Sequence, residues 1–139
     1  MNRWLIKSDP HDYSAHDLAR DGQTTWDGVR NPVALKHLRA MQPGDAVLVY
    51  HTGGEKAVVA TASVAAAPRP DAKDAKLAVV ELRFEDWLVS PAMLKAVKAD
   101  AFFADFALVR QARLSVMPVT DEQWKRLLKM GGGLAETGR

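Results

Sequence analysis

Three short segments of the sequence combine aromatic and polar side chains. The aromatic side chains can stack on a flat ring, and the polar ones can hydrogen-bond to the edge of that ring. Segment 26–31, WDGVRN, holds an aromatic residue, an acid, an arginine and an amide. Segment 4–10, WLIKSDP, ends on a lysine, a hydroxyl and an acid before a proline, and Tyr50-His51 closes a third apolar run. Aromatic rings stack on nucleobases, whereas hydroxyls, amides and cations hydrogen-bond to base edges and phosphates. The residue types therefore suit a site for one splayed-out base.

Each segment also has a purely structural interpretation, such as a core tryptophan, a turn, a helix cap or a solvated strand end. Position favours the functional one, because each segment lies where a predicted strand meets a turn. If these strand ends converge, Trp26 and Tyr50 form an aromatic wall that polar and cationic groups surround. The residues expected to line this site are Lys7, Ser8, Trp26, Arg30, Asn31 and Tyr50.

The motifs of common enzymes and metal sites are missing from the sequence. There is no cysteine, so thiolate zinc sites and cysteine nucleophiles are excluded. The four histidines lack HExxH spacing, and no GxSxG elbow or glycine-rich phosphate loop is present. We expect no metal, no cofactor and no catalysis. Two alternatives stay open: an enzyme using His51 or Asp27 as general base, and a module for a small molecule or peptide.

Length and composition indicate one globular domain. The 139 residues are 47% apolar and 26% charged, which suffices for a hydrophobic core. We expect a domain over residues 1–131 and a disordered tail over 132–139. The net charge of +2 suits local reading of one base better than coating of a duplex. No stretch is long enough to span a bilayer, so a cytoplasmic monomer without membrane contact is expected.

Apolar patterning and capping residues predict the element order β-α-β-α-β-β-β-α-β-α. The order indicates an α/β (α+β) fold whose mixed or antiparallel sheet can curl into a barrel, with helices at the sides. Helices are expected to begin at Ser14, at Asn31-Pro32, at Ser90-Pro91 and at Thr120. The expected strands cover residues 3–7, 24–26, 46–51, 57–66, 76–88 and 113–116.

Four motifs, kept in order and spacing, resemble the EVE domain family of the PUA-like superfamily. They are WLIKSDP at 4–10, WDGVRN at 26–31, GDAVLVYH at 44–51 and RLSVMPV at 113–119. The resemblance implies a PUA-like fold, a small mixed β-barrel flanked by helices, with kinship to YTH and ASCH domains. It also implies recognition of a modified base in DNA or RNA.

The resemblance implies the same pocket residues and adds four to them: His51, Arg113, Leu114 and Ser115. The chain departs from the family pattern at two positions. Asp9 stands where relatives usually carry the longer glutamate, and Thr52 follows His51 where many relatives have serine.

Overall fold

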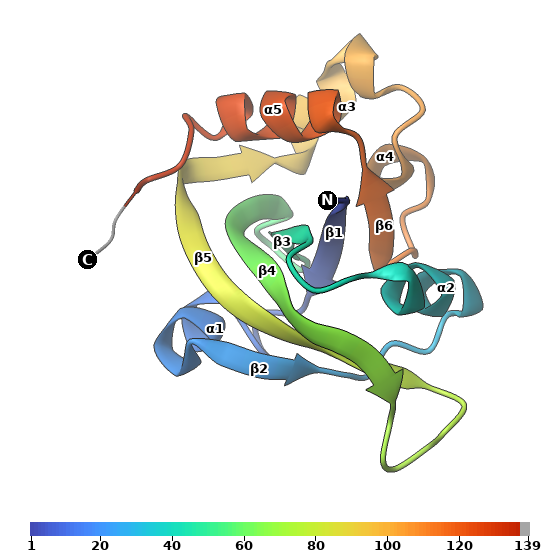
Figure 1. Ribbon diagram of the computed structural model, residues 1–139. Coiled ribbons are helices and arrows are strands. Elements are labelled where there is room, and N and C mark those ends of the chain that lie inside the picture. The colour runs from blue at the N-terminus through green and yellow to red at the C-terminus, as the bar shows by residue number, and fades with distance from the viewer. Residues whose placement is uncertain (137–139) are drawn as a thin grey trace.

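The computed structural model describes residues 1–136, and its elements alternate along the chain much as the sequence predicts (Figure 1). In chain order they are β1 (Arg3–Ser8), α1 (Ala15–Asp21), β2 (Gln23–Trp26), α2 (Pro32–Ala40), β3 (Ala46–His51), β4 (Ala57–Pro70), β5 (Ala78–Met93), α3 (Leu94–Ala99), the 3-10 turn η1 (Ala101–Phe103), α4 (Ala107–Arg110), β6 (Val116–Val119) and α5 (Asp121–Met130).

The strands of residues 1–136 form a six-stranded sheet in the order β2-β5-β4-β3-β1-β6. The β1 and β3 strands pair in parallel, and the other neighbours pair antiparallel. Register shifts interrupt the long β4–β5 ladder, and such bulges bend and twist a strand pair. The sheet curls into a barrel-like form with helices around it (Figure 1). The predicted mixed α/β barrel with flanking helices is confirmed.

The parallel pair at the centre of the sheet brings two of the predicted site segments together. The apolar residues of β1 and β3 are buried except for Ala46, which is partly buried, and Ile6 and Leu48 have no exposed surface. Their register sets Lys7 beside Tyr50 and Ser8 beside His51. The strand ends singled out from sequence are therefore neighbours in the sheet.

Local capping chemistry begins three of the helices where the sequence predicts. The Ser14 hydroxyl accepts from the Asp17 N–H and completes a capping box at α1. Asn31 caps α2 with Pro32 in its first turn. Thr120 forms the second capping box with Gln123 at α5. These signals depend on four consecutive residues or fewer, so sequence alone can locate them.

The helix start predicted at Ser90-Pro91 is wrong, because both residues belong to β5 and α3 begins at Leu94. The Ser90 N–H donates to the Gly131 carbonyl, and Ala92 pairs with Val58 across the sheet. Proline has no backbone N–H to donate to a neighbouring strand. Pro91 is exposed, so the strand tolerates it at this position. The last strand is also displaced: β6 covers Val116–Val119, not 113–116.

Gly131 closes α5 directly against β5. A Cβ at this position would lie 2.4 Å from Leu88 Cδ2 and 2.8 Å from the Ser90 carbonyl oxygen, so only glycine fits. Beyond it, Leu134 bridges to Leu88 and the Ala135 N–H donates to the Trp87 carbonyl.

The tail expected over 132–139 is thus held against β5 as far as the described residues extend, and 137–139 lie outside them. No helix within residues 1–136 combines the length and apolar character needed to cross a bilayer.

Candidate functional site

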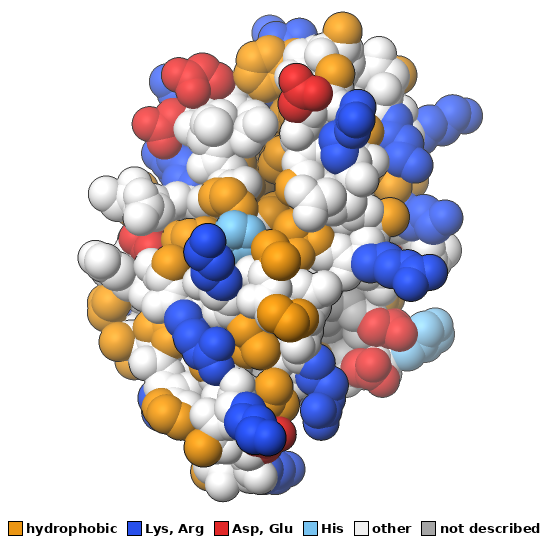
Figure 2. All heavy atoms as spheres, turned by 90° about the vertical axis from the view of Figure 1, so that its right-hand side faces the viewer, with side chains coloured by type: hydrophobic (Ala, Val, Ile, Leu, Met, Phe, Trp, Pro, Cys, Tyr) orange, Lys and Arg blue, Asp and Glu red, His pale blue; other side chains and the backbone are white. Residues whose placement is uncertain are grey.

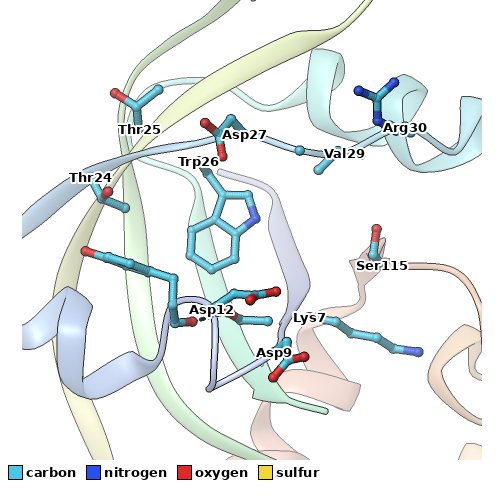
Figure 3. Close-up of a pocket in the computed structure, with 13 residues that line it drawn as sticks. Lys7, Asp9, Asp12, Thr24, Thr25, Trp26, Asp27, Val29, Arg30 and Ser115 are labelled. Carbon is cyan, nitrogen blue, oxygen red and sulfur yellow. Dashed lines mark hydrogen bonds between the residues drawn. The ribbon is translucent and has the colours of Figure 1, made fainter. Parts of the chain in front are cut away.

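A pocket of about 520 Å³ opens where β1 and β2 end. Its walls come from residues 7–9 at the end of β1, residues 12–13 in the loop to α1, residues 24–30 at the end of β2 and Ser115 ahead of β6. Figure 3 shows Trp26 in the middle of these residues. The pocket therefore combines strand ends that are distant in sequence.

Trp26 forms a wall of this pocket. It ends β2, pairs with Val80 of β5 and is only 9% exposed, so the surrounding protein fixes its ring. The described residues give its indole N–H no acceptor, and the nitrogen points across the pocket toward Ser115 (Figure 3). This N–H is therefore a donor that a ligand can use.

The second aromatic of the pocket is Tyr13, which sequence reasoning missed. Its ring meets that of Trp26 edge to face, with centroids 6.1 Å apart and planes at 84°. The Ser8 hydroxyl donates to the Tyr13 carbonyl, and the Tyr13 hydroxyl donates to Asp21 Oδ2 at 2.8 Å. Burial, followed by the neighbouring Asp21, raises the pKa of the phenol overall. The only sequence signal was an aromatic residue shortly after the Ser-Asp-Pro turn.

Lys7 supplies a cation at one side of the pocket. Its ammonium donates to the Ala112 carbonyl at 2.8 Å and lies 5.8 Å from the centre of the Tyr50 ring. Burial lowers the pKa of the Lys7 ammonium below the ordinary lysine value. A partly desolvated ammonium interacts more strongly with an anion than one in bulk water does.

Three further charged groups on the pocket carry no partner. Within residues 1–136, no ion pair or hydrogen bond engages the carboxylates of Asp12 and Asp27 or the Arg30 guanidinium. Asp27 directly follows Trp26, and Arg30 stands farther along the same loop (Figure 3). The pocket thus offers free acceptors as well as free donors next to an aromatic wall.

Tyr50 and His51 lie behind the pocket and do not line it. Tyr50 is buried, and burial raises the pKa of its phenol. His51 Nε2 accepts from the Ala15 N–H at 2.9 Å, which places the ring proton on Nδ1, 2.7 Å from Glu55 Oε1. Both nitrogens of the candidate general base are therefore engaged in joining β3 to α1 and to the next turn.

Asn31, Arg113 and Leu114 line a separate groove of about 260 Å³, together with Val33, Gln111 and Ala112. Asn31 Oδ1 accepts from the Val33 and Ala34 N–H groups at 2.8 and 3.1 Å, so this oxygen serves the helix. The groove adjoins the pocket, because Asn31 follows Arg30 and Leu114 precedes Ser115. Of the predicted residues, the pocket itself collects Lys7, Ser8, Trp26, Arg30 and Ser115.

Comparison with known proteins identifies the architecture. A model of the EVE domain matches residues 2–130. The chain belongs to the EVE domain family. The predicted family resemblance is confirmed, and this EVE domain carries the four motifs on the strands and loops described above.

Relatives of this EVE domain occur in bacteria and vertebrates. A Rhodopseudomonas palustris protein solved by NMR is 39% identical, with 95% of this chain and 94% of that chain covered and a TM-score of 0.90. Thymocyte nuclear protein 1 of Danio rerio is 28% identical over 93% of this chain and 71% of its own length.

Human thymocyte nuclear protein 1 was solved in complex with DNA containing 5-methylcytosine. It is 22% identical to this EVE domain, with 94% of this chain and 98% of that chain covered and a TM-score of 0.85. At this identity the likeness establishes a shared fold.

Among residues 1–136, no group of three His, Asp or Glu side chains is arranged to hold a metal ion. What the pocket offers is an aromatic wall with hydrogen-bonding groups around it.

Proposed function

We propose that this EVE domain binds nucleic acid and holds one modified base in the pocket beside Trp26. The observation that carries the proposal is an indole N–H without an acceptor among residues 1–136, in a pocket that also holds carboxylates without a partner there. Its volume of about 520 Å³ lies within the range of roughly 300–1,000 Å³ found for ligand pockets. The DNA complex of human thymocyte nuclear protein 1 supports a nucleic acid as the ligand class.

The polar groups suit the edge of a base. Asp27 and Asp12 can accept from an exocyclic amino group, as carboxylates do from cytosine N4. The Trp26 N–H and the Ser115 hydroxyl can donate to a ring nitrogen or carbonyl, and Lys7 can meet a phosphate or base acceptor. Stacking against an aromatic wall is worth about 1–3 kcal/mol per base, which offsets the cost of unstacking.

A methyl group on the base adds a smaller amount of binding free energy than stacking does. Burial of one methyl contributes about 0.8 kcal/mol, which corresponds to roughly fourfold in affinity. We therefore expect aromatic and polar contacts to supply most of the affinity and the modification to supply a modest preference.

The proposal is one of binding without turnover. His51, the candidate base for catalysis, uses Nε2 to accept the Ala15 N–H and lies outside the pocket. Asp27 lines the pocket, and within residues 1–136 no hydrogen bond or ion pair orients its carboxylate.

The test is a titration of labelled oligonucleotides that differ only by 5-methylcytosine or cytosine at one position. The wild type should bind the methylated strand more tightly, and Trp26→Ala should weaken binding of it by about 5- to 150-fold, the equivalent of one stacked base. Phe102→Ala is the matched control, because Phe102 is an exposed aromatic residue outside the pocket. Equal binding of both strands by wild type and Trp26→Ala would overturn the proposal.

A further inference from the structure

The excess of positive over negative charge in this chain comes from two stretches that lack acidic residues. Residues 28–44 and 106–120 contain Arg30, Lys36, Arg39, Arg110 and Arg113 and no acidic residue. The whole chain has 19 Lys and Arg residues and 17 acidic residues. Outside the two stretches, 14 Lys and Arg residues therefore stand against all 17 acidic residues. A small net charge therefore hides a strongly uneven distribution.

The fold brings these two stretches onto one side of the molecule. They hold α2, α4 and β6, and α2 packs on β6. Figure 2 shows that side, with Lys and Arg side chains spread over it and acidic side chains mostly toward its margins. We call the five exposed cations Arg30, Lys36, Arg39, Arg110 and Arg113 the basic face.

The basic face is not neutralised by carboxylates. Elsewhere Arg3, Arg20 and Arg126 form ion pairs at 2.8–3.0 Å with Asp121, Asp17 and Asp100. Within residues 1–136, none of the five cations of the basic face has a carboxylate within ion-pair distance. Arg39 donates only to the Lys76 carbonyl. Uncompensated cations on one face mark a surface that attracts polyanions.

A hollow joins the basic face to the base pocket. The groove of about 260 Å³ runs between Val33 of α2 and the loop 111–114, and its lining includes Arg113. It meets the pocket across Arg30-Asn31 and Leu114-Ser115, since Arg30 and Ser115 line the pocket. Past Val33, the outward residues Lys36 and Arg39 continue along α2.

We infer that this groove and the basic face bind the phosphodiester backbone next to the base that enters the pocket. The inference rests on the proposed function and adds the path of the strand: from the pocket, past Arg113 and Arg110, along the outer side of α2. Phosphate contacts position a strand without reading sequence. The basic face should therefore contribute to affinity and salt dependence, whereas the pocket discriminates the base.

The test measures affinity against salt concentration for a single-stranded 12-nucleotide DNA with one central 5-methylcytosine, its unmodified copy and the same sequences in RNA. Two double variants probe the basic face: Arg110→Gln with Arg113→Gln, and Lys36→Gln with Arg39→Gln. The control is Lys73→Gln with Arg83→Gln, which removes two exposed cations from elsewhere. Thermal unfolding verifies that each variant is folded.

A plot of the logarithm of the association constant against the logarithm of the salt concentration has a negative slope. Each lost phosphate contact should make this slope less steep by about 0.7 on a single strand. Two lost contacts then weaken binding roughly 20-fold at 0.1 M salt, while the preference for 5-methylcytosine stays unchanged. Slopes and affinities equal to those of the control variant would overturn the inference. Absence of any preference in the wild type would instead overturn the proposed function, and the slopes would still decide whether the basic face binds the backbone.

Discussion

Individual side chains in this protein serve either the fold or the pocket, and their hydrogen-bond partners show which. No acceptor within residues 1–136 pairs with the Trp26 N–H, whereas Trp4 donates its N–H to Asp45 Oδ2 at 2.9 Å inside the core. Asn31 serves the fold, because its oxygen caps α2, and it also lines the groove next to the pocket. A residue type that suits a base is therefore only a candidate until its partners are known.

Two substitutions of Asn31 test its role as the cap of α2. Asn31→Ala removes the capping oxygen and should lower the free energy of unfolding by about 1 kcal/mol. Asn31→Asp keeps the oxygen and places a negative charge at the helix N-terminus, so it should retain stability. Urea unfolding of both variants measures the difference. An Asn31→Ala variant as stable as the wild type would contradict the capping role.

At the scale of elements, two buried polar residues hold the strands in the positions that shape the pocket. His51 ties the end of β3 to the start of α1, and α1 follows the loop that carries Tyr13. Asp45 accepts from the Asn2 N–H, the Trp4 indole and the Gln42 N–H, and so fixes β1 against the turn before β3. Neither residue lines the pocket: His51 pairs with Ser8 at the end of β1, next to the pocket, and Asp45 lies at the opposite end of the β1–β3 pair.

Loss of the His51 ring should weaken the fold. In His51→Ala the buried Ala15 N–H loses its acceptor, at a cost of about 1–3 kcal/mol in the free energy of unfolding. His11→Ala is the control, because His11 is exposed. Chemical denaturation compares the two. If His51→Ala unfolds like the control, the proposed link between β3 and α1 carries no stability.

Asp45 should make stability depend on acid. Burial alone would raise the pKa of this carboxyl, but hydrogen bonds from Trp4, Gln42 and Asn2 outweigh it and hold the pKa below the ordinary value. The carboxylate therefore stabilises the fold fully above the unfolded-state pKa of about 3.9, and this contribution is lost as the pH falls through the lower folded-state pKa.

Asp45→Asn removes that dependence, because an amide offers one oxygen where the three donors need two. Unfolding measured from pH 7 to pH 2 should show the variant less stable at neutral pH by about 1–3 kcal/mol, with the gap narrowing below the folded-state pKa. A constant gap across this range would contradict the assignment.

At the scale of the whole molecule, the sequence predicts the order of elements better than it predicts which side chains meet. The order of strands and helices along the chain followed from apolar runs such as Ala46 to His51 and from local caps. The extension of β5 through Pro91 depends on Gly131, forty residues away, and no local pattern reveals that pairing.

Prediction of the site from the sequence is limited in the same way, because local patterns do not reveal which distant side chains meet. The sequence located the strand ends that form the pocket but paired Trp26 with Tyr50. Only the curl of the sheet and the path of the loop before α1 decide that Tyr13 faces Trp26 and that Tyr50 is buried.

The central claim is that a base enters the pocket beside Trp26, and NMR of the four tryptophan indole N–H groups tests it most directly. Trp26→Phe identifies the Trp26 signal by its absence, and Trp4 and Trp124 are internal controls because both are buried outside the pocket. On titration with the 5-methylcytosine strand, the Trp26 signal should shift most and the Trp4 and Trp124 signals should stay in place. Binding that leaves the Trp26 signal unmoved would contradict the account.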